Sequence, residues 1–362
     1  MHTRWAVGLN RILPIGSQWQ TKWEDGSRKA GARVTIAEKL LAYHGIRGEH
    51  DRECSWEYCY RHFHKAKAEA ISADRNCAAL QLSSYLASWG MYRNSFLLQH
   101  AYTVQLGVVD CLLQSKFSAL WDQEFGASAN DTDLVPLILG VYQEVRTAYS
   151  PFGKATDTLV TKVLLGTIGC FPALDKYFND GYRHHSGFNV PDPLNPAFIE
   201  GVLRFCQKYL DDFQDEQVRI EQKYKMHYPL MKLVDMYFHQ IGLELAKDDL
   251  KQRLTRYKRI KISAIGTTSG QTISISVRFV LEGEKVYLLP VKGSGTQWYK
   301  NMIQNPLIRI DARGAEEEFR GVPITEVKAV KSVIENFREK YGAKDVKKYY
   351  SKFDVAVVSE LS

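Results

Sequence analysis

The chain has 362 residues, of which 45% are hydrophobic and 25% are charged, a composition that excludes a disordered chain and allows two domains. The net charge of +7 is uneven, because residues 251–362 hold 21 Lys/Arg and 12 Asp/Glu and so carry +9, which leaves −2 for the rest. No run of about 18 apolar residues and no continuous signal-peptide core occurs in the sequence, so we expect a cytoplasmic protein with no membrane partner.

Residues 64–245 carry apolar side chains at helical spacing and predict an all-α domain over residues 1–246. Residues 1–50 are rich in glycine and charge, and we expect this segment to be loosely structured. The expected helices cover 66–89, 95–121, 133–149, 157–169, 196–224 and 228–245. No period of 20–50 residues repeats, which argues against a solenoid.

Cysteine and histidine gather at one place, Cys54-x4-Cys59-x2-His62-x-His64. Structural zinc sites use four such ligands, usually in pairs two to four residues apart. The cysteine pair is at the limit of that spacing, and the two histidines fall on different sides of a helix. We therefore expect buried thiols, surface histidines and no metal site.

A lysine and an aspartate in the helical region suggest a second chemistry. Lys162 lies on an apolar helix that a glycine ends, and Phe171-Pro172 precedes Asp175. This pattern is distantly similar to the helix-hairpin-helix DNA glycosylases, in which a lysine attacks the sugar carbon and an aspartate stabilises positive charge. The alternative is structural: Lys162 pairs with an acid, and Asp175 caps the next helix.

The adjacent His184 and His185 are expected in a solvent-exposed loop, whereas Asp235, inside an apolar run, is expected as a buried and paired carboxylate.

A charged helix or linker is expected over residues 247–261, and after it the apolar period changes from helical to alternating. Strands are expected at 272–279, 286–289, 307–311, 317–322 and 355–358, with helices at 324–341 and 344–352. Strands followed by short helices indicate a small α+β domain over residues 262–362, built on an antiparallel barrel.

The sequence of one loop in this domain suggests an anionic ligand. Between a strand and an aromatic-rich helix stand Lys292, Gly293, Ser294, Gly295 and Thr296. Such a loop can direct several backbone N–H groups and hydroxyls at one anion, and the following helix adds its positive N-terminal end. On the outward side of its strand, Arg278 is a further anion candidate.

The order of these parts resembles the deazaflavin-dependent nitroreductase family of the split β-barrel flavin-binding superfamily. The resemblance is carried by the segment 267–272, the two alternating strands, Trp298-Tyr-Lys-Asn301, Asn305-Pro306 and the strand at 307–311. It covers about residues 258–358 and implies a split barrel that binds flavin (FMN) or a deazaflavin (coenzyme F420) and transfers hydride. It also implies a homodimer, because split barrels commonly place the cofactor at a subunit junction.

The resemblance places the cofactor phosphate near the loop that precedes the Trp-Tyr helix. Trp298 and Tyr299 would edge the ring system or pack the helix on the barrel. The residues implied at the cofactor are Arg278, Lys292, Gly293, Ser294, Thr296, Trp298, Tyr299 and Lys300. No acid–base pair is required, since the cofactor supplies the chemistry, and no catalytic residue is assigned.

Three functions therefore stand open. The first is a flavin- or deazaflavin-type oxidoreductase or cofactor-binding protein. The second is a non-enzymatic protein whose basic barrel docks nucleic acid or another protein. The third is a glycosylase-like activity of the helical domain through Lys162 and Asp175.

Overall fold

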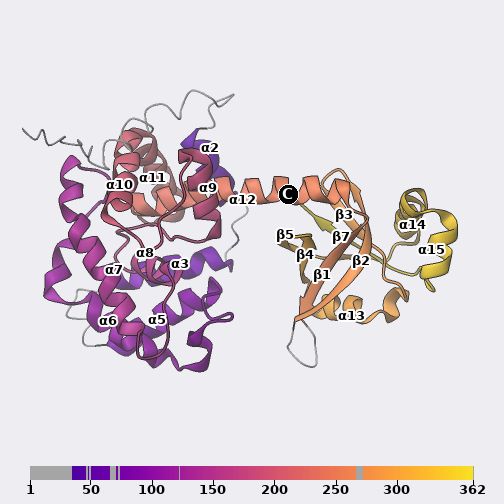
Figure 1. Ribbon diagram of the computed structural model, residues 1–362, viewed down its shortest axis with the longest axis horizontal. Helices are drawn as coiled ribbons and strands as arrows, with labels where there is room; N and C mark the ends of the chain where they lie inside the picture. Colours follow the sequence, from indigo (N-terminus) through magenta and orange to yellow (C-terminus); the bar gives the residue numbers. More distant parts are fainter. Residues whose placement is uncertain are drawn as a thin grey trace, which may run out of the picture. The chain divides into compact units, whose positions relative to one another are not determined.

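The computed structural model describes residues 35–45, 48, 50–65, 71, 74–121, 123–265 and 272–361 (Figure 1). The chain divides into two compact units, Met1–Gly242 and Leu243–Ser362, named here the N-terminal and C-terminal units. Of the segment expected to be loose, residues 1–34 lie outside the described residues, and Ile36–His44 is helical. Nowhere in the described ranges does a helix combine the length and apolarity needed to cross a bilayer.

The described part of the N-terminal unit is helical, as predicted. Its α-helices are α2 (Ile36–His44), α3 (Arg52–Lys65), α5 (Arg75–Ser88), α6 (Leu106–Leu112), α7 (Val135–Tyr149), α8 (Asp157–Gly166), α9 (Lys176–Ser186), α10 (Pro196–Lys208), α11 (Leu210–Tyr224) and the first part of α12 (Leu230–Arg256). The residues of α12 from Leu243 onward belong to the C-terminal unit. Short 3₁₀ helices lie at Phe96–Gln99, Tyr102–Gln105, Ser115–Leu120 and Ala129–Leu134.

Two expected helices are divided. The stretch 95–121 contains only α6 as an α-helix, with 3₁₀ turns on either side, and Ser95 accepts a hydrogen bond from the Leu97 amide that starts the first turn. The stretch 196–224 breaks at Tyr209, whose φ of −117° and ψ of 30° are not helical. Apolar periodicity finds both stretches but does not detect local changes of backbone direction.

Helices α9 and α12 approach closely at two glycines. A Cβ atom on Gly181 would lie 1.9 Å from the Phe238 carbonyl oxygen, and one on Gly242 would lie 1.9 Å from the Tyr177 carbonyl oxygen. Both distances are far below van der Waals contact, so the two backbones meet only because these residues have no side chain.

The expectation of a solvent loop at His184 and His185 is wrong, because both lie in the last turns of α9. A left-handed glycine, Gly187, ends that helix at φ 77°. His185 packs against the rings of Phe205 and Phe238, with centroids 5.2 and 5.6 Å away. Burial, followed by the nearby Lys208 charge, lowers the pKa of His185 to about 4.

The C-terminal unit contains an antiparallel sheet of seven described strands in the order β5-β4-β1-β2-β3-β7-β6. The sheet curls, so that β5 also contacts β7. The strands are β1 (Arg259–Ile265), β2 (Thr272–Glu282), β3 (Lys285–Leu288), β4 (Leu307–Ala312), β5 (Ala315–Arg320), β6 (Val322–Ile324) and β7 (Ala356–Glu360). Its helices are α13 (Gln297–Gln304), α14 (Val327–Tyr341) and α15 (Ala343–Tyr349).

Each face of the sheet has its own core. Ile260 and Ile262 of β1 point with Phe279 of β2 into the curled interior. On the outer face, Val280 packs with Phe337 of α14. Alternate residues of β2 thus serve opposite cores, which the period of two predicts.

The helix expected at 247–261 extends only to Arg256, and Arg259 already begins β1, the strand between β2 and β4. The sequence did not predict this strand because its apolar positions, Ile260 and Ile262, alternate with Arg259 and Lys261 inside a charged segment.

The contact between α9 and α12 predicts that Gly181→Ala lowers the free energy of unfolding of the N-terminal unit by about 1–3 kcal/mol or more, the usual cost of forced overpacking. Gly107→Ala in α6 is the matched control, because a Cβ there meets nothing within 4 Å. Helix propensity predicts that Gly107→Ala raises the free energy of unfolding by up to about 1 kcal/mol. Denaturant unfolding of both variants measures the difference, and equal stability would contradict the close approach.

The position of His185 predicts loss of stability in mild acid. Its folded-state pKa lies below the ordinary 6.5, so the unfolded chain binds the proton more readily between pH 6.5 and about 4, and stability falls as the pH falls through this window. The loss attributable to His185 is up to roughly 3 kcal/mol. Denaturant unfolding at pH 7 and pH 4.5 should show a smaller pH dependence for His185→Phe than for the parent chain, with His184→Phe as the control.

Candidate functional site

The loop that the sequence predicts for a phosphate has its backbone donors engaged within the protein. The amide of Lys292 donates to the Thr296 hydroxyl at 2.9 Å, and the amide of Gly293 donates to the Pro290 carbonyl at 3.0 Å. Gly295 and Thr296 donate to the carbonyls of Lys292 and Gly293, both at 3.0 Å. These bonds close Gly293–Gly295 into a 3₁₀ turn ahead of α13.

The remaining amide of the loop binds a carboxylate of the same chain. Ser294 donates its N–H to Asp354 Oδ1 at 2.9 Å and its hydroxyl to Asp354 Oδ2 at 2.5 Å. Lys352 Nζ lies 2.5 Å from the same Oδ2 and 3.0 Å from the Ser294 hydroxyl. Asp354 thus occupies the position that an anion would take in this loop.

Gly293 is required by this arrangement. Its φ is +51°, and a Cβ there would lie 1.9 Å from Asp354 Oδ1. Burial would raise the pKa of Asp354, but the bonds from Lys352 and Ser294 outweigh it and hold that pKa below its usual range. A cofactor phosphate would reach the Ser294 donors only by displacing this carboxylate.

The aromatic pair after the loop lies in the core. Trp298 and Tyr299 are each 6% exposed, belong to the cluster inside the curled sheet and meet edge to face at 6.4 Å. This placement corresponds to the packing alternative for both residues. Lys300, on the same helix, is exposed.

Arg278 does not join the loop residues in any described contact. Its guanidinium lies between the rings of Tyr341 and Tyr349, at 4.9 and 4.6 Å from their centroids, and one nitrogen is 3.1 Å from Asp345. The sequence-predicted residues are therefore distributed over a closed loop, a core and a separate basic surface.

A groove that the sequence did not predict lies on the outer strands of the sheet. It has a volume of about 580 Å³ and is lined from β3, β5, β6 and β7. Apolar side chains contributed to it include Tyr287, Phe319, Val322 and Val358, and charged ones include Lys285, Glu318, Arg320 and Glu360. No local motif could have found it, because its walls come from strands as far apart in the chain as β3 and β7.

The charges around this groove are mostly paired. Lys285 lies 3.8 Å from Glu360, and Arg309 lies 3.0 Å from Glu318. Among the residues that the structure describes, none forms an ion pair with Arg320, which is exposed. The groove thus combines an aromatic and aliphatic surface with one cation that is available to a ligand.

In the N-terminal unit, the predicted pair Lys162 and Asp175 is brought together. Lys162 Nζ is 3.2 Å from Asp175 Oδ2, and His239 Nδ1 is 3.5 Å from the same oxygen. Asp175 Oδ1 accepts from the Phe178 amide and caps α9. Although burial would raise it, Lys162 and His239 hold the pKa of Asp175 well below its usual range.

This geometry corresponds to the structural alternative for the pair. Lys162 is only 3% exposed, and its ammonium also lies 4.6 Å from the centre of the Trp89 ring. A nucleophilic amine must be reachable by its substrate, whereas this one is enclosed beside a carboxylate.

A second buried lysine adjoins the first. Lys232 Nζ is 2.8 Å from Asp235 Oδ2 and faces Trp89 at 5.6 Å. Asp235 also accepts from the Ala173 amide at 3.1 Å, which confirms it as a buried, paired carboxylate. Burial alone would lower the pKa of Lys232, but Asp235 and Tyr43 raise it above its ordinary value, so the amine stays protonated.

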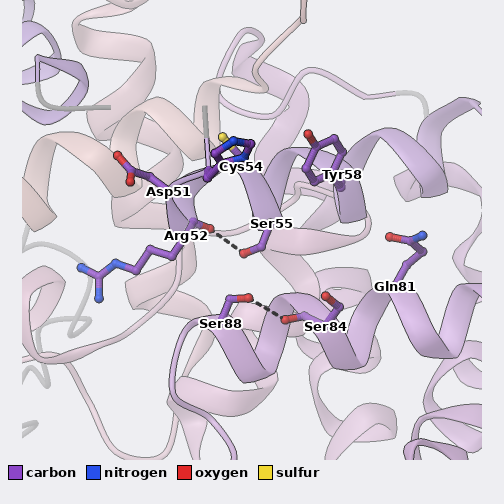
Figure 2. A pocket seen from close by; sticks show the side chains of 9 residues that line it. Asp51, Arg52, Cys54, Ser55, Tyr58, Gln81, Ser84 and Ser88 are labelled. Carbon is purple, nitrogen blue, oxygen red and sulfur yellow. Dashed lines mark hydrogen bonds between the residues drawn. The ribbon is translucent and has the colours of Figure 1, made fainter. Parts of the chain in front are cut away.

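A polar pocket of about 530 Å³ lies between α3 and α5 (Figure 2). Its lining includes Arg52 and Tyr58 from α3 and Gln81 and Ser88 from α5. Arg52 is also 4.9 Å from the centre of the Trp89 ring, on which both buried lysines lie. The pocket is therefore linked to the lysine pair through one arginine and one indole.

The cysteine–histidine cluster is not arranged around a metal. Cys54 approaches the Gly48 carbonyl, Cys59 is fully buried, and His64 bonds the Thr167 carbonyl at 2.9 Å. Burial lowers the pKa of His62 and raises that of Cys59. Within the described ranges, no three His, Cys, Asp or Glu side chains converge as metal ligands.

No protein-family model matches the chain, and no curated protein matches its sequence. Among solved structures, it is similar to a domain-swapped dimer at 14% identity, with a TM-score of 0.25 over 32% of this chain and 98% of that one. An F420-H2-dependent reductase has 14% identity, with a TM-score of 0.24 over 28% of this chain and 94% of that one. A Listeria innocua protein assigned as a pyridoxamine 5′-phosphate oxidase has 10% identity, with a TM-score of 0.25 over 32% and 90%. Scores of this size carry no argument, so function is argued from the side chains of this chain.

The loop geometry predicts that Asp354→Asn releases the 292–296 loop. Charge-assisted bonds to a carboxylate contribute about 1.5–3 kcal/mol, reduced here because Asp354 is 33% exposed. The amides of the loop should exchange with deuterium faster in the variant, as measured by mass spectrometry, while the exposed Glu339→Gln leaves them unchanged. In the parent chain this protection should be complete above about pH 4, the unfolded value, and decrease only as the pH falls further through the depressed pKa. Unchanged exchange in Asp354→Asn would show that the carboxylate does not hold the loop.

Proposed function

We propose that the C-terminal unit binds a flavin- or deazaflavin-type cofactor and acts as an oxidoreductase, with the ring system in the groove of β3, β5, β6 and β7. The observation that carries the proposal is the groove itself. Its volume of about 580 Å³ falls in the range of cofactor and ligand sites, roughly 300–1,000 Å³. The sequence resemblance to deazaflavin-dependent proteins supplies the class of cofactor.

The side chains in the groove suit a flat ring with an anionic tail. Tyr287 provides aromatic surface, and Val322 and Val358 provide aliphatic surface. Because Lys285 and Glu318 already have described ionic partners, Arg320 is the cation assigned to the tail. A guanidinium matches a phosphate through two parallel hydrogen bonds.

The loop before α13 is the alternative position for the phosphate. The predicted residues Lys292, Gly293, Ser294 and Thr296 would serve there only after Asp354 has moved out. The groove needs no such displacement, and for this reason we place the cofactor there.

When bound, a flavin-type ring supplies hydride transfer, and the protein binds, orients and shields it. In this assignment Tyr287 contacts one face of the ring and keeps water from it, while Arg320 fixes the tail. Val322, which is 48% exposed, leaves the other side open to a substrate or to a second copy of the chain. A homodimer, which the resemblance implies, would cover it.

Titration of the purified chain with FMN and with coenzyme F420 tests this function. We expect a spectral shift of the bound cofactor. Arg320→Gln should weaken binding about tenfold or more, because a lost charge-assisted bond costs about 1.5–3 kcal/mol. Tyr287→Ala should weaken it comparably through lost ring contact, and Lys328→Gln on α14 is the control for a lost surface charge.

Two results would decide against this placement. If neither cofactor binds at micromolar to millimolar concentration, the C-terminal unit is not a site for such a cofactor. If binding occurs and is abolished by Ser294→Ala but unaffected by Arg320→Gln, the loop rather than the groove holds the phosphate.

A further inference from the structure

A basic and aromatic surface around Arg278 is left unexplained by the groove. The Arg278 guanidinium is enclosed by Tyr341 at 4.9 Å and Tyr349 at 4.6 Å, and Asp345 is its ionic partner at 3.1 Å. Its Nη1 atom is buried and has no hydrogen-bond partner among the described residues. A buried donor on a charged group without a partner is costly.

Like charges are set beside one another on this surface. Arg259 of β1 is the cross-strand partner of Arg278 in β2. The Lys340 ammonium of α14 lies 5.6 Å from the centre of the Tyr341 ring. Burial, followed by the charge of Lys258, lowers the pKa of Lys340. Like charges directly opposite each other destabilise a sheet, and the described pairing of this cluster includes a single carboxylate, Asp345.

The end of α14 fixes the position of these groups. The Tyr341 hydroxyl lies 2.6 Å from the Phe279 carbonyl oxygen and 2.7 Å from the Lys258 carbonyl oxygen. It thereby joins α14 to both β1 and β2, and it holds one of the two rings that enclose Arg278. The cluster is therefore built into the fold rather than formed by mobile lysines alone.

Helix α15 extends the basic surface. Asp345 and Tyr349, four residues apart, face Arg278. Lys344 and Lys348 are each next to one of them in the chain, and both are exposed. Tyr349 is 46% exposed, so part of its ring remains available for stacking with a base.

We propose that the surface formed by Lys258, Arg259, Arg278, Lys340, Lys348 and Tyr349 binds the phosphodiester backbone of single-stranded nucleic acid. Cations spread over two strands and two helices, and an exposed ring next to them, are the elements with which proteins hold such strands. A single small anion would neutralise one of these cations and leave the others repelling one another. This activity is independent of the cofactor groove, whose residues are different.

Fluorescence anisotropy with a labelled oligonucleotide of about 15 nucleotides, near the site size of single-strand binding modules, tests the proposal on the full chain. The logarithm of the affinity should fall linearly with the logarithm of salt concentration, with a slope of about −0.7 for each phosphate contacted. Arg278→Gln should weaken binding at least tenfold. Lys348→Gln, at an exposed position that does not affect folding, should reduce the slope by about 0.7.

The control is Lys331→Gln, which removes the same charge on α14 at about 14 Å from Lys340 along the helix axis. It should leave the affinity within twofold of the parent chain. Cofactor titration of the same variants should be unchanged, which separates a failure here from a failure of the proposed cofactor site.

Three results would overturn the proposal. The first is no binding at low salt, and the second is that Arg278→Gln and Lys348→Gln both bind as tightly as the parent chain. The third is tighter binding of a duplex than of single strands of the same length. Inorganic phosphate provides a further arm. If phosphate displaces the oligonucleotide much more strongly than chloride at equal ionic strength, the surface is a site for a small phosphate and not for a strand.

Discussion

The bond between Asp354 and Ser294 determines what chemistry is left open to the C-terminal unit. The loop before α13 has the composition of an anion-binding loop and also its geometry, since an oxygen anion does accept its serine amide and hydroxyl. That anion is supplied by the chain itself, from a position 60 residues further along the sequence. The bond thus joins the segment before β7 to the turn that precedes α13. The Ser294 donors are therefore already occupied when an external ligand approaches the loop.

In the N-terminal unit, too, charged side chains are neutralised by partners within the chain. Lys162 and Lys232 are among the least exposed lysines of the described chain, and each has its own aspartate. Each aspartate also accepts a backbone amide, so the pairs fix α8, α9 and α12 to the segment that joins α8 and α9. Breaking one partner of such a pair leaves an uncompensated charge, which is far more damaging than the pair is stabilising. These groups therefore serve architecture first.

The sequence predicted the helical region, most strands of the sheet and the reversal of faces along β2, because all of these follow from apolar periodicity. It missed β1, whose alternation is concealed by Arg259 and Lys261, and it placed His185 in a loop because adjacent histidines carry no periodic signal. Residues 266–271, which carry part of the family resemblance, lie outside the described residues. The partners of the predicted site residues could not have been inferred: Asp354 reaches Ser294, and Tyr341 reaches Arg278, across long separations with no local signature. The groove arises only when β5 curls against β7, so no single segment of the sequence predicts it.

The glycine contact between α9 and α12 has a consequence for charge. Gly181 and Gly242 let the two helices approach at backbone distance, and the same two helices carry Asp175, at the N-cap of α9, and His239, on α12. A slide of α12 by a single residue would move His239 by about 1.5 Å along the axis and would set a side chain against the Tyr177 carbonyl. The approach of His239 to Asp175 therefore depends on two residues that have no side chain, so that steric fit between α9 and α12 contributes to the electrostatics of this interior.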